Sequence, residues 1–208
     1  MCSGAPSCLS FMCSLLLEKK PRSLLDVGIG HGKWGFLARE YADLWRPGNK
    51  YGEIDQNGFD HSDRYDSERF YGKERMRLVG IEIFEPYVTD IQLMIYDEIL
   101  IGNVYEILPT MEECFEMIIA ADVVEHLEKG EAVELFKEFK KHGKETYVLI
   151  PINCGSSGVA EHGNDYAIHR SKWEFEELGI FGKASIIGDI YYLLEIAGDL
   201  QMNFNWEG

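Results

Sequence analysis

Leu24–Gly32 reads LLDVGIGHG, a short apolar run that ends in an acid and leads into three glycines at every second position. The apolar run is long enough for a buried strand, and glycines let the backbone turn sharply and approach a ligand closely. Residues 33–41 continue with the apolar spacing of a helix. A strand, a glycine loop and a helix in this order predict a cradle for a nucleotide-type ligand.

The length and composition indicate one globular domain over residues 1–208. The chain has 46% hydrophobic residues and a formal net charge of -16, which disfavours electrostatic capture of nucleic acid or an anionic membrane. Five cysteines form no C-x-x-C pair, which is typical of reduced thiols in a cytoplasmic protein. The apolar stretch at 9–17 is too short to span a bilayer and predicts an amphipathic N-terminal helix.

Apolar runs with strand character alternate with helix-like segments along the chain. Their continuous apolar character predicts an α/β fold with a parallel sheet covered on both faces. Near the C-terminus, two further runs are separated only by Gly188-Asp189, a joint so tight that the pair must be antiparallel. The sheet is therefore expected to be mixed, with an antiparallel strand near one edge. The seven predicted strands are 23–27, 78–83, 98–102, 115–122, 146–150, 184–187 and 190–197.

One polar segment, from about Arg46 to Lys73, interrupts this alternation. It is rich in Gly, Asp and Tyr and has little apolar periodicity. A loop this long inside a compact domain is usually functional or disordered. Two interpretations stay open: an acceptor-binding lid and a surface loop.

Polar residues follow three more of the predicted strands. Glu82 is placed where an acid can accept hydrogen bonds from ribose hydroxyls, although an ordinary solvent-facing Glu is the alternative. Asn103 and the backbone at Val104 could meet an adenine ring, although Gly-Asn is also a common turn dipeptide. The run Asp122–Leu127 begins at the end of a buried strand, where open sheets bind ligands.

In this order, these features resemble the class I S-adenosylmethionine-dependent methyltransferases. The glycine loop is similar to the first motif of that family, and Asp122–Leu127 is similar to the Asp-x-x-Glu-His-Leu run of its small-molecule subgroup. The segment 163–173 resembles one that follows the fifth strand and contains a His and an aromatic residue. Asn103 in place of the usual acid and the insertion at 46–73 depart from the family pattern.

The resemblance implies a Rossmann-like three-layer sandwich with a seven-stranded mixed sheet, and S-adenosylmethionine as cofactor. Asp26 and the loop would hold the methionine part of the cofactor, and Asp122 its ammonium or the substrate. Glu82 would bind ribose. The implied cofactor-binding residues are Asp26, Gly28, Gly30, Gly32, Glu82, Ile83, Asn103, Val104 and Asp122. The acceptor is expected to be a small or medium-sized molecule, and a homodimer is left open.

Catalysis by this chemistry requires mainly alignment, because the sulfonium already carries an activated methyl group. A general base helps only where the acceptor must lose a proton. His126 and His169 are the candidates, since an unperturbed imidazole titrates near neutrality. A structural hydrogen bond at the start of a helix is the alternative for His126.

A different function uses the same residues. Asp122, Glu125, His126 and His169 could surround a divalent metal, an arrangement that resembles the metal-dependent RNA terminal 2'-O-methyltransferases. The acidic composition argues against this function, because phosphate contacts need basic residues. We therefore assign no metal ligand from the sequence.

Two rival classes complete the expectations. One is a module that binds the cofactor without catalysis. The other is a dinucleotide oxidoreductase, because Gly30, Gly32 and Gly35 fit G-x-G-x-x-G. The long interval to Glu82 disfavours the oxidoreductase.

Overall fold

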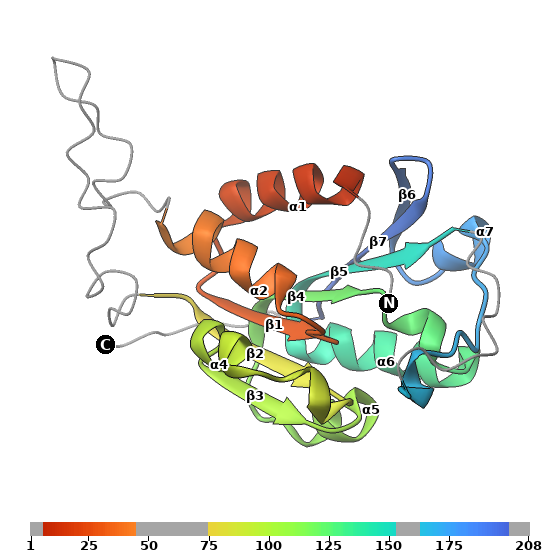
Figure 1. Cartoon of the computed structure of the whole chain (residues 1–208). Helices are drawn as coiled ribbons and strands as arrows, with labels where there is room; N and C mark the ends of the chain where they lie inside the picture. The colour runs from red at the N-terminus through yellow and green to blue at the C-terminus, as the bar shows by residue number, and fades with distance from the viewer. Residues whose placement is uncertain (1–5, 45–74, 153–162, 200–208) are drawn as a thin grey trace, which may run out of the picture.

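The computed structural model describes residues 6–44, 75–152 and 163–199 (Figure 1). The predicted insertion at 46–73 lies outside the described residues, as do Cys2 and Cys154. The remaining cysteines, Cys8, Cys13 and Cys114, form no disulfide among the described residues, in line with the predicted reduced thiols.

The described chain forms a seven-stranded sheet with the order β3-β2-β1-β4-β5-β7-β6. Five strands are parallel, and β7 runs antiparallel to both β5 and β6, so the predicted mixed sheet is confirmed. The antiparallel strand is second from the edge, because β6 returns through the tight turn at Gly188-Asp189. The strands are β1 (Ser23–Val27), β2 (Arg77–Glu82), β3 (Glu98–Ile101), β4 (Phe115–Ala121), β5 (Gly143–Pro151), β6 (Lys183–Ile187) and β7 (Tyr191–Ala197).

The seven predicted strands all exist; β1 has the predicted boundaries, and the boundaries of the other strands shift by up to three residues. The largest shift is at β5, which begins at Gly143 rather than at residue 146. Gly143 pairs with Phe115 of β4, and a side chain at this position would collide with Ile118. The polar start of β5 carries no apolar signal, so only the pairing with β4 reveals it.

Alternate residues of each strand point to opposite faces of the sheet and build two cores. One core contains Leu24, Leu78 and Met117, together with side chains from α1 (Pro6–Lys19) and α2 (Lys33–Ala38). The other contains Leu25, Val79 and Ile118, together with side chains from α6 (Lys129–His142). Figure 1 shows α1 and α2 on one side of the sheet and α6 on the other. This is the three-layer sandwich that the resemblance implied.

The predicted N-terminal helix is α1. Its buried residues Cys8, Met12, Leu15 and Leu16 recur at helical spacing and face the sheet. No helix in the described ranges combines the length and the apolar character needed to cross a membrane.

Shorter elements connect these layers. The α2 helix continues directly into a π-helical turn, η1. The short helix α4 follows β2 and sends Ile95 and the adjoining Tyr96 into the same core as α1 and α2. The remaining elements are η1 (Arg39–Leu44), η2 (Glu85–Tyr87), α4 (Asp90–Ile95), α5 (Val104–Ile107), η3 (Leu108–Thr110), η4 (Val124–His126), η5 (Asp165–Ala167) and α7 (Phe175–Leu178).

Candidate functional site

The glycine loop turns sharply as it leaves β1. Gly28, Gly30 and Gly32 have positive φ angles of 72°, 50° and 80°, in the left-handed region that glycine tolerates and other residues avoid. The amide of Gly28 donates to the Ile81 carbonyl of β2 at 2.9 Å. The loop therefore bends over the carboxyl end of the neighbouring strand.

The three glycines differ in what surrounds them. A Cβ at Gly28 would lie 2.6 Å from Cγ2 of Val123, so packing against the turn after β4 requires glycine there. A Cβ at Gly30 would meet no atom of the described chain within 4 Å. Gly30 therefore borders open space at the tip of the loop, where a ligand can approach the backbone.

Glu82 ends β2 and binds the glycine loop directly. Its carboxylate accepts hydrogen bonds from the Gly30 amide at 2.8 Å and from the Phe84 amide at 2.9 Å. Burial raises the pKa of Glu82, and these backbone donors oppose the increase. The solvent-facing alternative for Glu82 is wrong, because the side chain is only 5% exposed.

Gln92 of α4 binds the other side of Gly30, through its carbonyl, and sequence reasoning missed it. Its Nε2 donates to the Gly30 carbonyl at 3.1 Å, while its Oε1 accepts from the Thr89 amide and hydroxyl. The sequence signal is the Thr89–Gln92 pair, which forms a capping box at the start of α4. Glu82 and Gln92 together hold Gly30 in one orientation.

Asp26 is completely buried in the middle of the site. The Tyr96 hydroxyl donates to its Oδ2 at 2.5 Å, and Oδ1 has no hydrogen-bond partner among the described residues. Burial raises the pKa of Asp26 to about 7, and the hydrogen bond from Tyr96 opposes this increase. A buried carboxylate oxygen without a partner is a candidate ligand contact.

The Tyr96 ring packs against two glycines, at positions where a side chain would collide with it. A Cβ at Gly35 would collide with the Tyr96 ring and hydroxyl, and a Cβ at Gly80 would lie 3.0 Å from its Cδ1. The absence of a side chain at Gly35 therefore makes room for the Tyr96 ring. Sequence reasoning missed Tyr96, because nothing local to it indicates a partner 70 residues away.

Asp26 ionisation predicts a pH-dependent stability difference between the protein and its Asp26→Asn variant. The folded pKa of about 7 lies above the ordinary value of 3.8, so the native state binds more protons than the unfolded state between these values. Stability of the unmodified protein therefore falls as the pH rises from about 4 to about 7.

The variant lacks this dependence. Its free energy of unfolding, relative to the unmodified protein, is expected to increase by roughly 4 kcal/mol across that interval and to level off above it. Urea denaturation of both proteins at several pH values measures the difference. A difference that stays constant with pH would show that Asp26 ionises normally.

Asn103 and Val104 start α5 beside the end of β2. The Asn103 side chain accepts from the Tyr105 amide at 3.0 Å and caps the helix, and the Gly102 amide donates to the Glu82 carbonyl at 2.8 Å. Val104 is buried in the core under α6, which leaves its backbone for any ligand contact. Asn103 thus has a structural role as the N-cap of α5, and an adenine contact stays a prediction.

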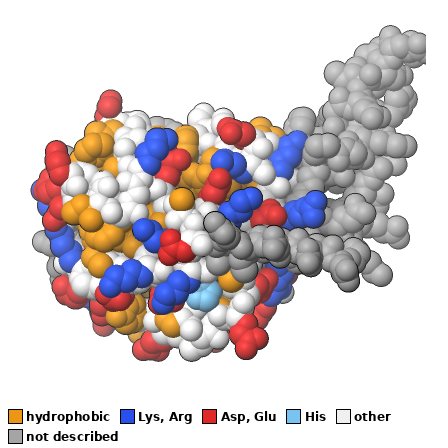
Figure 2. Space-filling model, turned by 180° about the vertical axis from the view of Figure 1, so that it is seen from behind, with side chains coloured by type: hydrophobic (Ala, Val, Ile, Leu, Met, Phe, Trp, Pro, Cys, Tyr) orange, Lys and Arg blue, Asp and Glu red, His pale blue; other side chains and the backbone are white. Residues whose placement is uncertain are grey.

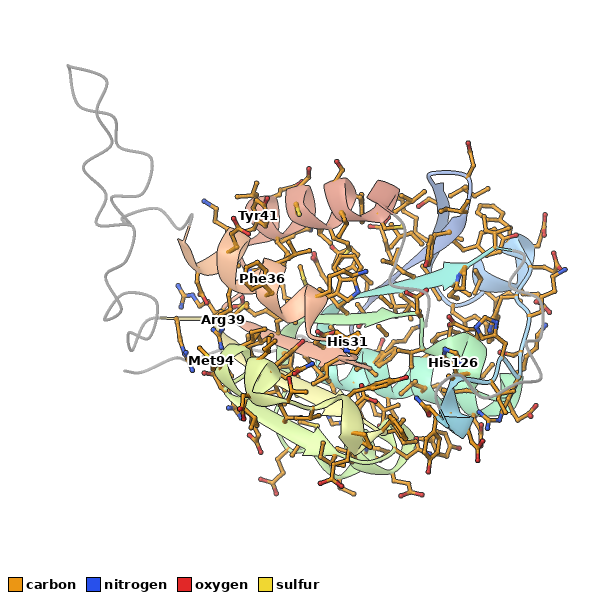
Figure 3. All side chains as sticks on the ribbon, viewed as in Figure 1. His31, Phe36, Arg39, Tyr41, Met94 and His126 are labelled. Atoms are coloured by element: carbon orange, nitrogen blue, oxygen red, sulfur yellow. The ribbon has the colours of Figure 1, made fainter. Side chains whose placement is uncertain are left out.

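Partly exposed aromatic rings lie next to Glu82 and Ile83. Phe84 and Tyr87 pack edge to face with their ring centroids 4.8 Å apart. The Tyr87 ring also contacts His31, at 5.4 Å between centroids. Figure 3 shows His31 on the loop that follows β1.

Asp122 follows β4 in a strained conformation, with a positive φ of 57°. The Tyr191 hydroxyl donates to its Oδ1 at 2.8 Å, and its amide donates to the Leu149 carbonyl of β5. These contacts hold the side chain at the carboxyl end of β4. Asp26, Glu82 and Asp122 thus gather at the ends of β1, β2 and β4. The strand order reverses between β1 and β4, which is where open α/β sheets bind ligands.

A second group of polar side chains lies just beyond Asp122. Ligand atoms of Glu125, His126 and His169 lie within 4.8 Å of one another, and the two imidazole rings are 4.9 Å apart. The Glu125 carbonyl accepts from the Arg170 and Ser171 amides at 2.8 and 3.0 Å. These bonds hold the 165–171 segment against η4. They bring His169 next to His126, which lies 43 positions earlier in the chain.

In this group, burial favours the neutral forms of Glu125 and His126. Both Glu125 oxygens and His169 Nδ1 are buried without hydrogen-bond partners in the described chain, and burial raises the pKa of Glu125 well above its ordinary value. Burial lowers the pKa of His126 to about 4. At neutral pH the 3.9 Å contact between His126 Nε2 and Glu125 is therefore not an ion pair. The His126 Nδ1 lies 3.3 Å from the Ile168 carbonyl oxygen, which can only accept a hydrogen bond. We therefore assign the proton of the neutral ring to Nδ1, which leaves Nε2 unprotonated.

This chain is similar to known proteins in its fold and not in its sequence. No protein-family profile and no curated protein sequence matches this chain. The chain is similar to the methyltransferase domain of bacterial CtHen1, with a TM-score of 0.55 and 10% identity over 92% of this chain and 97% of that one. It is also similar to the magnesium protoporphyrin IX methyltransferase of Synechocystis PCC 6803 with bound SAH, with a TM-score of 0.55 and 11% identity over 92% and 82%.

A third similar structure is an O-methyltransferase family protein from Burkholderia thailandensis. Its TM-score is 0.53 and its identity 11%, over 91% of this chain and 56% of that one. The fold is therefore that of the class I S-adenosylmethionine-dependent methyltransferases. This confirms the fold that the sequence motifs predicted.

Proposed function

We propose that this protein transfers a methyl group from S-adenosylmethionine to a small or medium-sized acceptor. One observation carries the proposal: Asp26, the open Gly30 backbone and Glu82 converge beside the point where the strand order reverses. The partnerless Asp26 Oδ1 and the empty space at Gly30 fit a ligand that has polar groups and needs close backbone approach.

Different residues of the site bind different parts of the cofactor. Asp26 and the Gly28–Gly32 loop bind the methionine part, and Glu82 binds the ribose through carboxylate lone pairs that its two backbone donors leave available. Ile83, Asn103 and the Val104 backbone border the adenine. Asp122 lies near the methionine ammonium or the acceptor. The bound cofactor supplies an activated methyl group, and the protein contributes alignment.

His126 and His169 are the two candidate general bases. His126 is neutral at pH 7, but its lowered pKa makes it a weak base. For an acceptor that must lose a proton, His169 is the candidate general base on its position: its ring lies 4.9 Å from that of His126, and its Nδ1 has no hydrogen-bond partner among the described residues. An acceptor that carries no such proton would need neither residue.

Isothermal titration tests the proposal against its rivals. We expect S-adenosylhomocysteine to bind and NAD not to bind. The reverse result would support an oxidoreductase. The observed strand order, with the antiparallel β7 next to the edge, differs from the order 3-2-1-4-5-6 of a dinucleotide-binding fold and so argues against that class. A screen of small alcohols, amines and acids with labelled cofactor then tests for methylation. If the cofactor binds but no acceptor is methylated, the protein is a binding module without catalysis.

The cluster of Glu125, His126 and His169 favours a second candidate, a metal-dependent RNA terminal 2'-O-methyltransferase. Two imidazoles and a carboxylate are suitable ligands for a divalent ion, and the partnerless groups of Glu125 and His169 would gain a partner. The net charge of -16 opposes RNA as the acceptor. On the face seen in Figure 2, Lys and Arg side chains lie among Asp and Glu side chains.

A metal titration separates the two candidates. The second candidate predicts that Mn²⁺ or Co²⁺ binds the protein stoichiometrically and that His169→Ala weakens this binding by at least tenfold. Cys13→Ala, outside the cluster, serves as the control for non-specific binding. An absence of metal binding leaves the small-molecule methyltransferase as the proposed function.

A further inference from the structure

Lys33 is a charged residue of the site that neither the glycine motif nor the proposed mechanism uses. It is the first residue of α2 and follows Gly32 directly. The side chain is partly buried, and its Nζ lies 4.2 Å from the ring centroid of Trp34. Within the described ranges, no hydrogen bond or ion pair satisfies the Lys33 ammonium.

The surroundings of Lys33 connect it to the candidate site. Burial lowers its pKa, while the charges of Asp122, Cys8 and Asp26 act in the opposite direction. These three groups come from the end of β4, from α1 and from β1. The ammonium thus lies near both acids that the proposed function assigns to the methionine part of the cofactor.

The charge of the cofactor explains why a cation is needed here. The methionine part carries an ammonium and a carboxylate. Asp26 and Asp122 can attract the ammonium, but in a chain with a net charge of -16 they repel the carboxylate. Lys33 is partly desolvated and has no hydrogen-bond acceptor among the described residues, so an anion that reaches its ammonium gains a charged partner.

We propose that Lys33 binds the carboxylate of the methionine part of S-adenosylmethionine. The inference rests on the proposed function. It makes Lys33 a specificity residue that distinguishes the complete cofactor from adenosine thioethers lacking the amino-acid group. Its contact with the Trp34 ring fixes the direction of the side chain.

Calorimetry with two ligands tests this assignment. S-Adenosylhomocysteine carries the amino-acid group, whereas 5'-methylthioadenosine lacks it. Lys33→Met is expected to weaken binding of S-adenosylhomocysteine by roughly 10- to 100-fold, the range for a lost charge-assisted hydrogen bond. Binding of 5'-methylthioadenosine should change less than about twofold, and Lys33→Arg should recover most of the loss.

Lys129 offers a matched control, because its Nζ also lies over a tryptophan ring, 5.4 Å from the centroid of Trp173. Lys129→Met should leave both affinities unchanged. If Lys33→Met does not fold, Lys33→Gln replaces it, with thermal unfolding as the check on both.

Each other outcome overturns the assignment. Equal losses for both ligands would make Lys33 a structural support of the loop. Unchanged binding with lost methylation would make it a catalytic group. If the unmodified protein binds neither ligand, the proposed function fails, and this inference fails with it.

Discussion

Replacing Gly30 with valine is expected to abolish binding of S-adenosylhomocysteine while the fold is retained. A Cβ at this position meets no atom of the described residues within 4 Å, so the valine methyl groups enter the space assigned to the ligand. The cost to the fold is the strain of a β-branched residue at a φ of 50°, about 1–3 kcal/mol. Calorimetry measures binding, and circular dichroism with thermal unfolding measures the fold.

Gly188→Val is the matched control for backbone strain. Gly188 has a φ of 59° in the exposed turn between β6 and β7, so the substitution introduces similar strain outside the cradle. The control should lose comparable stability and keep its affinity for S-adenosylhomocysteine. If Gly30→Val also binds normally, the glycine loop is not the cofactor cradle.

Replacing Arg39 with methionine is expected to cause the largest loss of stability, about 3–5 kcal/mol. Arg39 begins η1 and lies between the α2 segment and α4 (Figure 3). Its guanidinium is 1% exposed and donates to Asp43, to Asp97 and to the Met76 and Ile95 carbonyls, at 2.6 to 2.9 Å. Methionine fills much of the volume but leaves two carboxylates and two carbonyls without this donor.

Arg77→Met provides the comparison for Arg39. Arg77 pairs with Glu98 and Glu113, but its side chain is 34% exposed, and solvent screens these interactions. We expect it to cost less than about 1 kcal/mol. Urea denaturation of both variants measures the two losses of stability. Equal losses would mean that burial does not strengthen the contribution of the Arg39 contacts to stability.

The local features of this protein could be predicted from its sequence. Buried strands require uninterrupted apolar residues, so β1 and β4 appear as such in the chain. The turn at Gly188-Asp189 is too short for a crossover, which predicts the antiparallel β7. Gly28, Gly30 and Gly32 predicted a sharp turn because only glycine adopts positive φ at little cost, and all three have it.

The partners within the site were decided by the tertiary structure alone. The sequence identifies Asp26 and Gly30, but not that Tyr96, 70 positions away, donates to the first or that Gln92, 62 positions away, donates to the second. Parallel strands with crossovers bring distant segments to one edge, and the register, such as Asp26 beside Gly80, decides which side chains meet there. By itself, therefore, the sequence determined the strands, the glycine turn and the class of fold, since these follow from local conformational preference. Only the tertiary structure decided that Asp26 is buried with one oxygen that has no partner among the described residues, that the charges of two acids act on Lys33 and that His126 lies against His169. Burial and charge depend on neighbours in space.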